Sequence, residues 1–361
     1  MVIPSLLRGR QGPAWPVFAA TVLAMALFVP FSKEVLDVRY GYTLRTVAVG
    51  GALLGAVSGL LGSFAVLRKQ SLLGDALSHA ALPGVAVAFL LAGRDLPALL
   101  IGAGVASCLG VAFIKVVTAN TRIKDDAAMG IVLAGWFAAG LVGLTYIQGR
   151  SDASQAGLDT FIFGQAASIV RSDVTLLIAV SGVSVLLVIL FWKQFKLVTF
   201  NPEFAGANGF NVPFWQGFLS SLVVVAIVMG LQLAGVILMV GMLIAPGVAA
   251  RQWTNRLGEM VILSARFGAL SGGVGAVLSG ADENLPTGPM IIVVASVVVT
   301  LSLTLAPGRG VLWVLRRRRR DARRFAVRTL LRDVYHYAYD HGGPSTGVPE
   351  TFLLGVRPRS G

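Results

Sequence analysis

Long apolar runs dominate this sequence and limit what it can fold into. Segments of about 18 or more residues with few charges recur along the chain, and that length suits a helix crossing a bilayer. The mean hydropathy is +0.78 and only 13% of the residues are charged, which excludes a soluble multi-domain enzyme. We therefore expect an all-α, polytopic membrane protein with about eight to ten transmembrane helices.

The hydropathy pattern predicts ten spans, two of which share one long apolar stretch. They cover approximately residues 14–31, 46–67, 72–91, 96–117, 127–146, 174–192, two helices within 214–250, 261–280 and 288–305. Residues 230–235 give the long stretch a break because both ends are glycine. The first span resembles a signal peptide, but it is long for one, so we expect a retained helix.

Small residues at helical spacing indicate close helix packing. Gly51, Gly55 and Gly59 recur at every fourth position of the second span, and such ladders let membrane helices approach closely. The single cysteine, Cys108, lies in an apolar run and has no partner for an internal disulfide. We interpret it as a small packing residue.

Positive charge is distributed unevenly between the two predicted sides. The formal net charge is +13, and nine arginines lie between Arg316 and Arg332, just after the last span. Most other Lys and Arg residues flank predicted helix ends, and the side that holds both termini carries the majority. The positive-inside rule accounts for this pattern without a nucleic-acid partner, and it predicts that both termini are cytoplasmic.

An acid and an imidazole interrupt the third span. Asp75 and His79 are four residues apart, so a helix projects both side chains from one face. Counting about 1.5 Å per residue from Lys69 puts His79 about 15 Å deep, near the middle of a roughly 30 Å core. A charged group at that depth costs at least about 2.5–3.5 kcal/mol, so such residues usually mark a substrate or ion path. A hydrogen-bonded structural pair is the alternative.

Pro83 follows His79 by four residues and has no N–H group. The helical hydrogen bond to the carbonyl of His79 therefore cannot form, and we expect a kink beside the histidine.

A short helix is predicted in the loop after the sixth span. Asn201 is a good N-cap, Pro202 suits the first helical position, Glu203 complements the positive helix end, and Gly209 can adopt the left-handed conformation at its C-terminal end. Phe204 offers an apolar contact to a partner; a helix that merely shapes the loop is the alternative. The chain contains no Gly-x-x-x-x-Gly-Lys-[Ser/Thr] motif, so any ATP energy must come from another subunit.

These segments together resemble the membrane subunits of ATP-binding-cassette importers for zinc, manganese and iron ions. The stretch Gly74-Asp75-Ala76-Leu77-Ser78-His79 with Pro83-Gly84 is similar to the family's most characteristic motif. Residues 201–209, 243–251 and 282–289 agree with it in order, and the resemblance covers roughly residues 45–306.

The resemblance implies a fold and a set of partners. It implies a type II importer-like permease that acts as a dimer, with a second copy or a paralogue, in the bacterial inner membrane. Two ATPase subunits would bind ATP, an extracytoplasmic metal-binding protein would deliver the metal, and the chain would have no cofactor of its own. We expect three parts in the chain. Residues 1–44 would be an N-terminal segment with the first membrane helix, residues 45–310 the transmembrane domain of the metal permease, and residues 311–361 a basic cytoplasmic tail.

The resemblance also implies roles for particular residues. Those matching Asp75 and His79 would bind the metal in transit, and the pairs of two protomers would together offer two carboxylates and two imidazoles. The helix with Asn201, Glu203, Phe204, Ala205 and Gly209 would dock on the ATPase. An Asp is more usual where Asn201 stands, so capping is retained while any salt bridge of that Asp is lost.

Two further regions are open to interpretation. The outward loop with Asp282 and Pro286 would line the metal entry or contact the binding protein, or it is a plain turn. Residues 316–361 lie beyond the usual permease. Residues 328–337 weakly resemble the first helix of a winged-helix domain, but we favour a basic tail against anionic membrane lipids.

Three other functions are alternatives to a metal-ion importer. An importer of a metal chelate, such as a siderophore or cobalamin, would need a wide cavity and no mid-membrane ligand pair. An intramembrane metalloprotease would need a second histidine in the membrane region. A proton-coupled transporter could use Asp75 and His79 as a relay. Which metal is carried does not follow from the sequence.

Overall fold

The computed structural model describes residues 42–93, 95–149, 171–280, 285–307 and 309–340. Regular structure within these ranges is helical throughout, as predicted. The chain divides into two units, Met1–Ser302 and Leu303–Gly361. The helices are α2 (Tyr42–Leu67), α3 (Leu72–Ala92), α4 (Leu96–Asn120), α5 (Asp125–Gln148), α7 (Arg171–Leu190), α8 (Trp192–Phe200), α9 (Pro202–Ala207), α10 (Val212–Trp253), α11 (Leu257–Ser279), α12 (Thr287–Leu305) and α13 (Val311–Asp340).

Eight helical segments in the described ranges are long and apolar enough to cross a membrane. They belong to α2, α3, α4, α5, α7, the first half of α10, α11 and α12. The all-α membrane fold with eight to ten spans is therefore confirmed. The second half of α10, predicted as a span of its own, is not among the eight segments found in the described ranges. The first predicted span, residues 14–31, lies outside the described residues.

The long apolar stretch forms α10, in which two helical segments meet at a break. Within α10, Gly235 has φ +77° and ψ 166°, a conformation that L-residues rarely adopt. A Cβ on Gly230 would clash with the sulfur of Met239, so the segments on either side of the break lie against each other. The glycine-bounded break predicted from the sequence is confirmed.

The glycine ladder of α2 packs on a matching ladder of α11. A Cβ added at Gly55 would clash with the carbonyl oxygen of Gly268, and one at Gly268 would clash with that of Gly55. Gly51 and Gly272 face each other in the same way. Glycine is needed here because the two backbones touch, which is how small residues hold membrane helices together.

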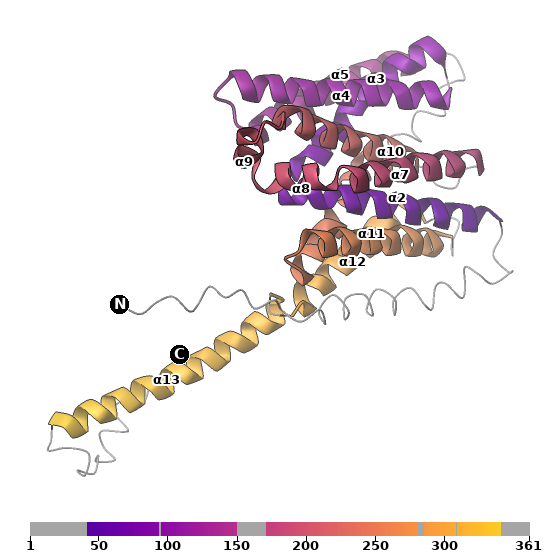
Figure 1. The fold of residues 1–361 in the computed structure, drawn as a ribbon. Helices are drawn as coiled ribbons and strands as arrows, with labels where there is room; N and C mark the ends of the chain where they lie inside the picture. Colours follow the sequence, from indigo (N-terminus) through magenta and orange to yellow (C-terminus); the bar gives the residue numbers. More distant parts are fainter. Residues whose placement is uncertain (1–41, 94, 150–170, 281–284, 308, 341–361) are drawn as a thin grey trace. The chain divides into compact units, whose positions relative to one another are not determined.

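The first unit is organised around α2, α3 and α10. α3 packs on both α4 and α5, which lie beside it in Figure 1, while α10 packs on α2 and α3. Leu243 of α10 is fully buried at this junction, where its carbonyl oxygen faces Gly62 and its side chain faces Gly74. The motif at residues 243–251 thus has a packing role next to the start of α3.

One segment differs from the expectation. Residues 193–200 were expected to be loop, but they form most of α8, a nine-residue helix. The side chains of Phe195 and Val198 are buried in it, and Phe195 packs against Phe191, Trp215 and Phe218. This aromatic cluster orders a segment whose lysines and glutamine make it polar in sequence.

Candidate functional site

The candidate site lies on one stripe of α3. Asp75, His79, Pro83, Val87 and Leu91 are spaced by four residues, so they form a stripe in which each residue lies about one turn beyond the last and about 40° further round the helix. α3 continues as one helix through Pro83. The two ionisable residues occupy the first part of the stripe, and apolar residues occupy the rest.

Asp75 and His79 face each other directly. The Nε2 atom of His79 is 3.4 Å from Oδ1 of Asp75, and their side chains are 17% and 35% exposed, respectively. A direct N–H···O hydrogen bond is usually about 2.7–3.2 Å long, so this contact is long for one. Two ligand atoms about 2.0–2.2 Å from a tetrahedral metal ion would be about 3.3–3.6 Å apart. The spacing is therefore compatible with chelation of a cation.

The other ring nitrogen of His79 is not held by a hydrogen bond to any described residue. Nδ1 of His79 is buried and has no hydrogen-bond partner in the described part of the chain. The edge of the ring packs on Phe137 of α5, with 4.8 Å between ring centroids. If the proton of the neutral imidazole is on Nδ1, Nε2 presents a lone pair beside the carboxylate of Asp75. Two electron-pair donors then converge on one point.

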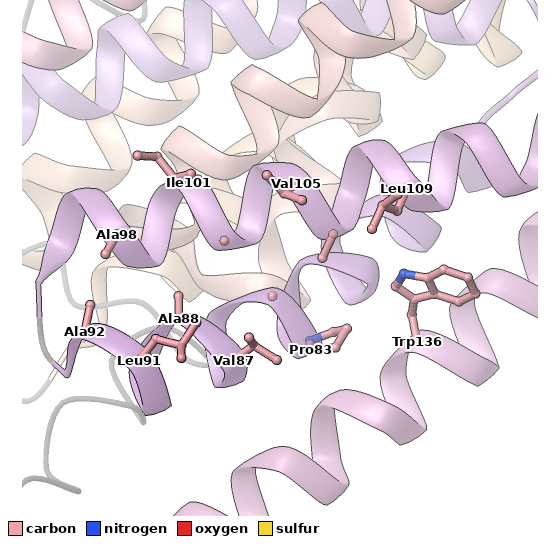
Figure 2. Close-up of a pocket in the computed structure, with 13 residues that line it drawn as sticks. Pro83, Val87, Ala88, Leu91, Ala92, Ala98, Ile101, Val105, Leu109 and Trp136 are labelled. Carbon is pink, nitrogen blue, oxygen red and sulfur yellow. The ribbon is translucent and has the colours of Figure 1, made fainter.

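The remainder of the stripe borders an apolar groove between α3 and α4. This groove has a volume of about 590 Å³. Figure 2 shows Pro83, Val87 and Leu91 of α3 on one side, Ile101 and other residues of α4 opposite, and Trp136 of α5 at one end. No lining residue is ionisable. The groove can hold apolar groups but offers no ligand to a metal ion.

The predicted short helix is present as α9. Oδ1 of Asn201 accepts a hydrogen bond from the backbone N–H of Phe204 at 3.0 Å, which confirms the predicted N-cap. Gly209 has φ +83°, as expected for its left-handed position. The side chain of Ala205 is buried, whereas Glu203 is exposed and Phe204 is 55% exposed. α9 therefore turns its alanine inward and its phenylalanine outward.

More exposed phenylalanines lie on both sides of α9. Phe200 precedes the helix and Phe210 follows it, and both have exposed rings. Exposed aromatic rings in sequence around a capped helix are typical of a surface that contacts another protein.

Two hydrogen bonds link the loop end of α10 to α3 through α4. Nζ of Lys115 donates to the carbonyl oxygen of Pro213 at 2.9 Å, in the first turn of α10. Eight residues earlier on α4, the buried Oγ of Ser107 donates to the carbonyl oxygen of Leu77 at 3.0 Å. Leu77 lies between Asp75 and His79 in the sequence. α4 thus contacts both the segment after α9 and the backbone of the candidate site.

A charged pair lies where α2 ends and α5 begins. Burial lowers the pKa of Arg68 to about 10, and the carboxylate of Asp125 partly offsets that effect. Arg68 therefore stays charged at neutral pH. It lies one residue beyond the end of α2, so the charge is placed outside the span.

Of the two predicted outer-loop residues, the structure describes only Pro286. Asp282 lies outside the described residues, and Pro286 is exposed just before α12. Oγ of Ser279 donates to the carbonyl oxygen of Leu285 at 2.6 Å and contacts Oγ1 of Thr287 at 2.9 Å. These contacts tie the end of α11 to the start of α12.

One chain supplies few metal ligands. The described residues contain no group of three or more His, Cys, Asp or Glu side chains that could hold a metal ion. The pair of Asp75 and His79 is therefore an incomplete ligand set by itself, because divalent metal sites usually have at least four ligands.

Some residues near the site were not found from the sequence. Phe137, Ser107 and Lys115 lie on α4 and α5 and reach the site or its neighbours only through tertiary packing. The sequence does indicate that Lys115 has a polar contact, because a lysine within an otherwise apolar run needs a polar partner.

Comparison with known proteins gives a consistent result. The model of the ABC 3 transport family matches residues 40–306. The chain is 48% identical over 280 residues to the zinc transport system membrane protein TroC of Treponema pallidum, covering 77% of this chain and 94% of that protein. It is 47% identical over 282 residues to the manganese transport system membrane protein MntC of Bacillus subtilis, covering 77% of this chain and 65% of that protein.

Solved structures also resemble this fold. The structure of PsaBC from Streptococcus pneumoniae in complex with Fab aligns with a TM-score of 0.67 and 32% sequence identity, covering 77% of this chain and 97% of that chain. A putative metal-chelate type ABC transporter in an inward-facing conformation aligns with a TM-score of 0.57 at 13% identity, which is a likeness of fold alone.

Proposed function

The chain belongs to the ABC 3 transport family, and from this premise we propose that it is the permease of an ATP-driven importer of divalent metal ions. Manganese and zinc are the metals in the names of its relatives, and iron remains a further candidate. We assign the permease to residues 45–310, in the bacterial inner membrane with both termini in the cytoplasm. The arginine-rich distribution supports that orientation.

The observation that carries the proposal is the 3.4 Å pair of Asp75 and His79 within a membrane-spanning helix. A carboxylate and a neutral imidazole suit borderline divalent ions such as manganese, zinc and ferrous iron. Since one chain offers two ligand groups, we propose that a second permease copy, or a paralogue, supplies the matching pair across a shared axis. The metal would be held briefly and then released to the cytoplasm.

We further propose that α9 docks on a separate ATPase subunit. Its exposed Phe204, flanked by Phe200 and Phe210, would enter an apolar pocket of that partner, and Asn201 would hold the helix in shape by capping it. Metal would be delivered by an extracytoplasmic binding protein, near the loop that contains Asp282 and Pro286. The absence of a Walker A motif from the sequence is consistent with ATP hydrolysis in the partner.

Three alternative functions are less well supported. A chelate importer would need a cavity with groups that recognise a polar chelate, and the groove beside Pro83 is apolar. An intramembrane metalloprotease would need a His-Glu-x-x-His helix, which the sequence lacks. A proton-coupled transporter would work without an ATPase, so co-purification of the ATPase separates it from the proposal.

The proposal is tested by measuring total cellular metal by mass spectrometry. Cells would express the chain with its ATPase and binding protein, as wild type, His79→Ala or His336→Ala. We expect one metal to accumulate in the wild type and the accumulation to fall by more than about tenfold in His79→Ala, because a ligand is lost. His336→Ala removes an exposed histidine outside the region that matches the family, so it should accumulate metal like the wild type.

The decisive comparison requires an assembled complex. Wild-type metal accumulation by His79→Ala, with the ATPase still co-purifying, would exclude His79 from the metal path. No accumulation of any metal by the assembled wild-type complex would reject the importer itself.

A further inference from the structure

The second unit contains a helix that metal transport does not explain. α13, Val311–Asp340, begins six residues after the end of α12 and lies beyond the region that matches the family. By sequence it contains nine arginines and three aspartates. A helix this basic, following a membrane span so closely, must begin near the headgroups of the bilayer.

The second half of α13 is amphipathic. Val327, Leu331, Tyr335 and Tyr339 are spaced by four residues and form a stripe along the helix, since each step turns it by about 40°. All four side chains are exposed, and the rings of Tyr335 and Tyr339 are stacked with 6.4 Å between centroids. Nothing in the described part of the second unit covers this apolar stripe.

Basic residues flank the apolar stripe. Arg328 and Arg332 each follow a stripe residue by one position, which places them about 100° further round the helix. Both are exposed, and Nε of Arg332 also contacts Oδ1 of Asp333 at 3.5 Å. His336 is exposed about 140° from Leu331, so it lies on the polar side. An apolar stripe with arginines at its edge is the pattern of helices that lie in a membrane interface.

We propose that α13 lies on the cytoplasmic surface of the bilayer and binds anionic lipid. The stripe from Val327 to Tyr339 would insert among the upper acyl carbons. Arg328 and Arg332 would extend their side chains to lipid phosphates. The net positive charge of the helix complements anionic headgroups, each basic residue near such a surface contributing about 1 kcal/mol. The tail would thereby anchor the permease in regions of anionic lipid, independently of the metal path.

The test measures the depth of single sites in α13. The full-length chain with Cys108→Ser, which removes the only cysteine, would carry either Leu331→Cys or His336→Cys, each labelled with a nitroxide. The protein would be placed in nanodiscs of phosphatidylglycerol or of phosphatidylcholine. Power-saturation electron paramagnetic resonance would compare the access of two reagents to each label. Oxygen is enriched in the bilayer, whereas the nickel chelate is water-soluble.

We expect the ratio of oxygen accessibility to nickel-chelate accessibility to be several-fold higher for the label at position 331 than for the label at position 336. This difference should appear in phosphatidylglycerol only. Adding Arg328→Gln and Arg332→Gln should reduce that difference. Both substituted positions are exposed, so the variants should fold. The accessibility of the labels does not depend on metal transport, so this experiment tests the inference separately from the proposed function.

Three results would overturn the inference. Equal accessibility of the two labels in phosphatidylglycerol would exclude insertion of the stripe. Equal burial of position 331 in both lipids would exclude the requirement for anionic headgroups. Shielding of position 331 only after an RNA oligonucleotide or the ATPase subunit is added would assign the stripe to that partner.

Discussion

At the residue scale, a metal ion bound by Asp75 and His79, as proposed, would compete with protons for both side chains. Both groups bind metal only when deprotonated, so metal affinity falls as the pH falls. Replacing the imidazole changes the chemistry of one of the two proposed ligands, so it should change how uptake depends on pH.

This argument gives a prediction for His79→Asp. We expect wild-type metal uptake to fall as the pH is lowered, because protonated ligands cannot bind metal, and the pH profile of the remaining uptake of His79→Asp to differ from that of the wild type. Initial uptake rates in proteoliposomes, divided by the ATP hydrolysis rate at each pH, measure this difference. Identical pH profiles for the two proteins would mean that the imidazole is not the proton-sensitive ligand.

Some residues of the candidate site could be predicted from the sequence, and others could not. Asp75 and His79 could be predicted because both lie on one helix, four residues apart, in an otherwise apolar run. The contact of Phe137 with the ring of His79 joins two helices, and a phenylalanine among many apolar residues carries no distinguishing signal. A pair of ionisable residues on one helix can thus be predicted from the sequence, whereas an aromatic contact between two helices can be found only in the folded structure.

At the scale of helices, the seam between α2 and α11 depends on glycines that touch across it. A Cβ at Gly268 would clash with the backbone of Gly55, so both helices would have to move apart along a buried interface. The sequence predicted the ladder of α2 from its spacing. It did not identify α11 as the partner, because several other predicted spans are also rich in small residues.

We predict that Gly268→Ala destabilises the protein by about 1–3 kcal/mol, the usual cost of overpacking. Gly104→Ala is the matched control, since a Cβ there meets no atom within 4 Å and alanine favours a helix. The midpoint of thermal unfolding in detergent, followed by size-exclusion chromatography, would measure both. Equal midpoints for the two variants would show that the seam tolerates separation.

Helix positions followed closely from hydropathy, and the exceptions have physical causes. α3 begins at Leu72 and α12 ends at Leu305, as predicted, because charges or turn residues bound the apolar runs. α8 was missed because its polar residues resemble a loop, while its order comes from aromatic packing with α10. Packing against a distant helix therefore overrode the local sequence signal.

At the scale of the whole permease, the proposed docking of α9 on an ATPase requires that a movement of α9 reach Asp75 and His79 on another helix. α4 offers such a connection, since Lys115 holds the first turn of α10 and Ser107 holds the backbone between Asp75 and His79. These two contacts are eight residues apart on one helix, a distance of about 12 Å. Rigid displacement of α4 would carry a shift near α9 to Asp75 and His79, provided that α9 docks on the ATPase as proposed.

We therefore predict that Lys115→Met uncouples ATP hydrolysis from transport. The substitution keeps the apolar stem but removes the hydrogen bond to the carbonyl oxygen of Pro213. Gly217→Ala is a second variant with the same aim, because its Cβ would lie 2.8 Å from the ammonium of Lys115 and displace it. In both variants the ATPase should still co-purify, and the amount of metal imported per ATP hydrolysed should fall several-fold in proteoliposomes.

Phe204→Ala separates coupling from assembly. If α9 docks through this exposed ring, the variant should lose the ATPase during purification, whereas Lys115→Met should retain it. A Lys115→Met complex that imports as much metal per ATP as the wild type would reject α4 as the connection. Since Ser107 would still tie α4 to the site in that variant, the result would direct attention to the contacts of α10 with α2 and α3 as the route by which the ATPase moves the metal ligands.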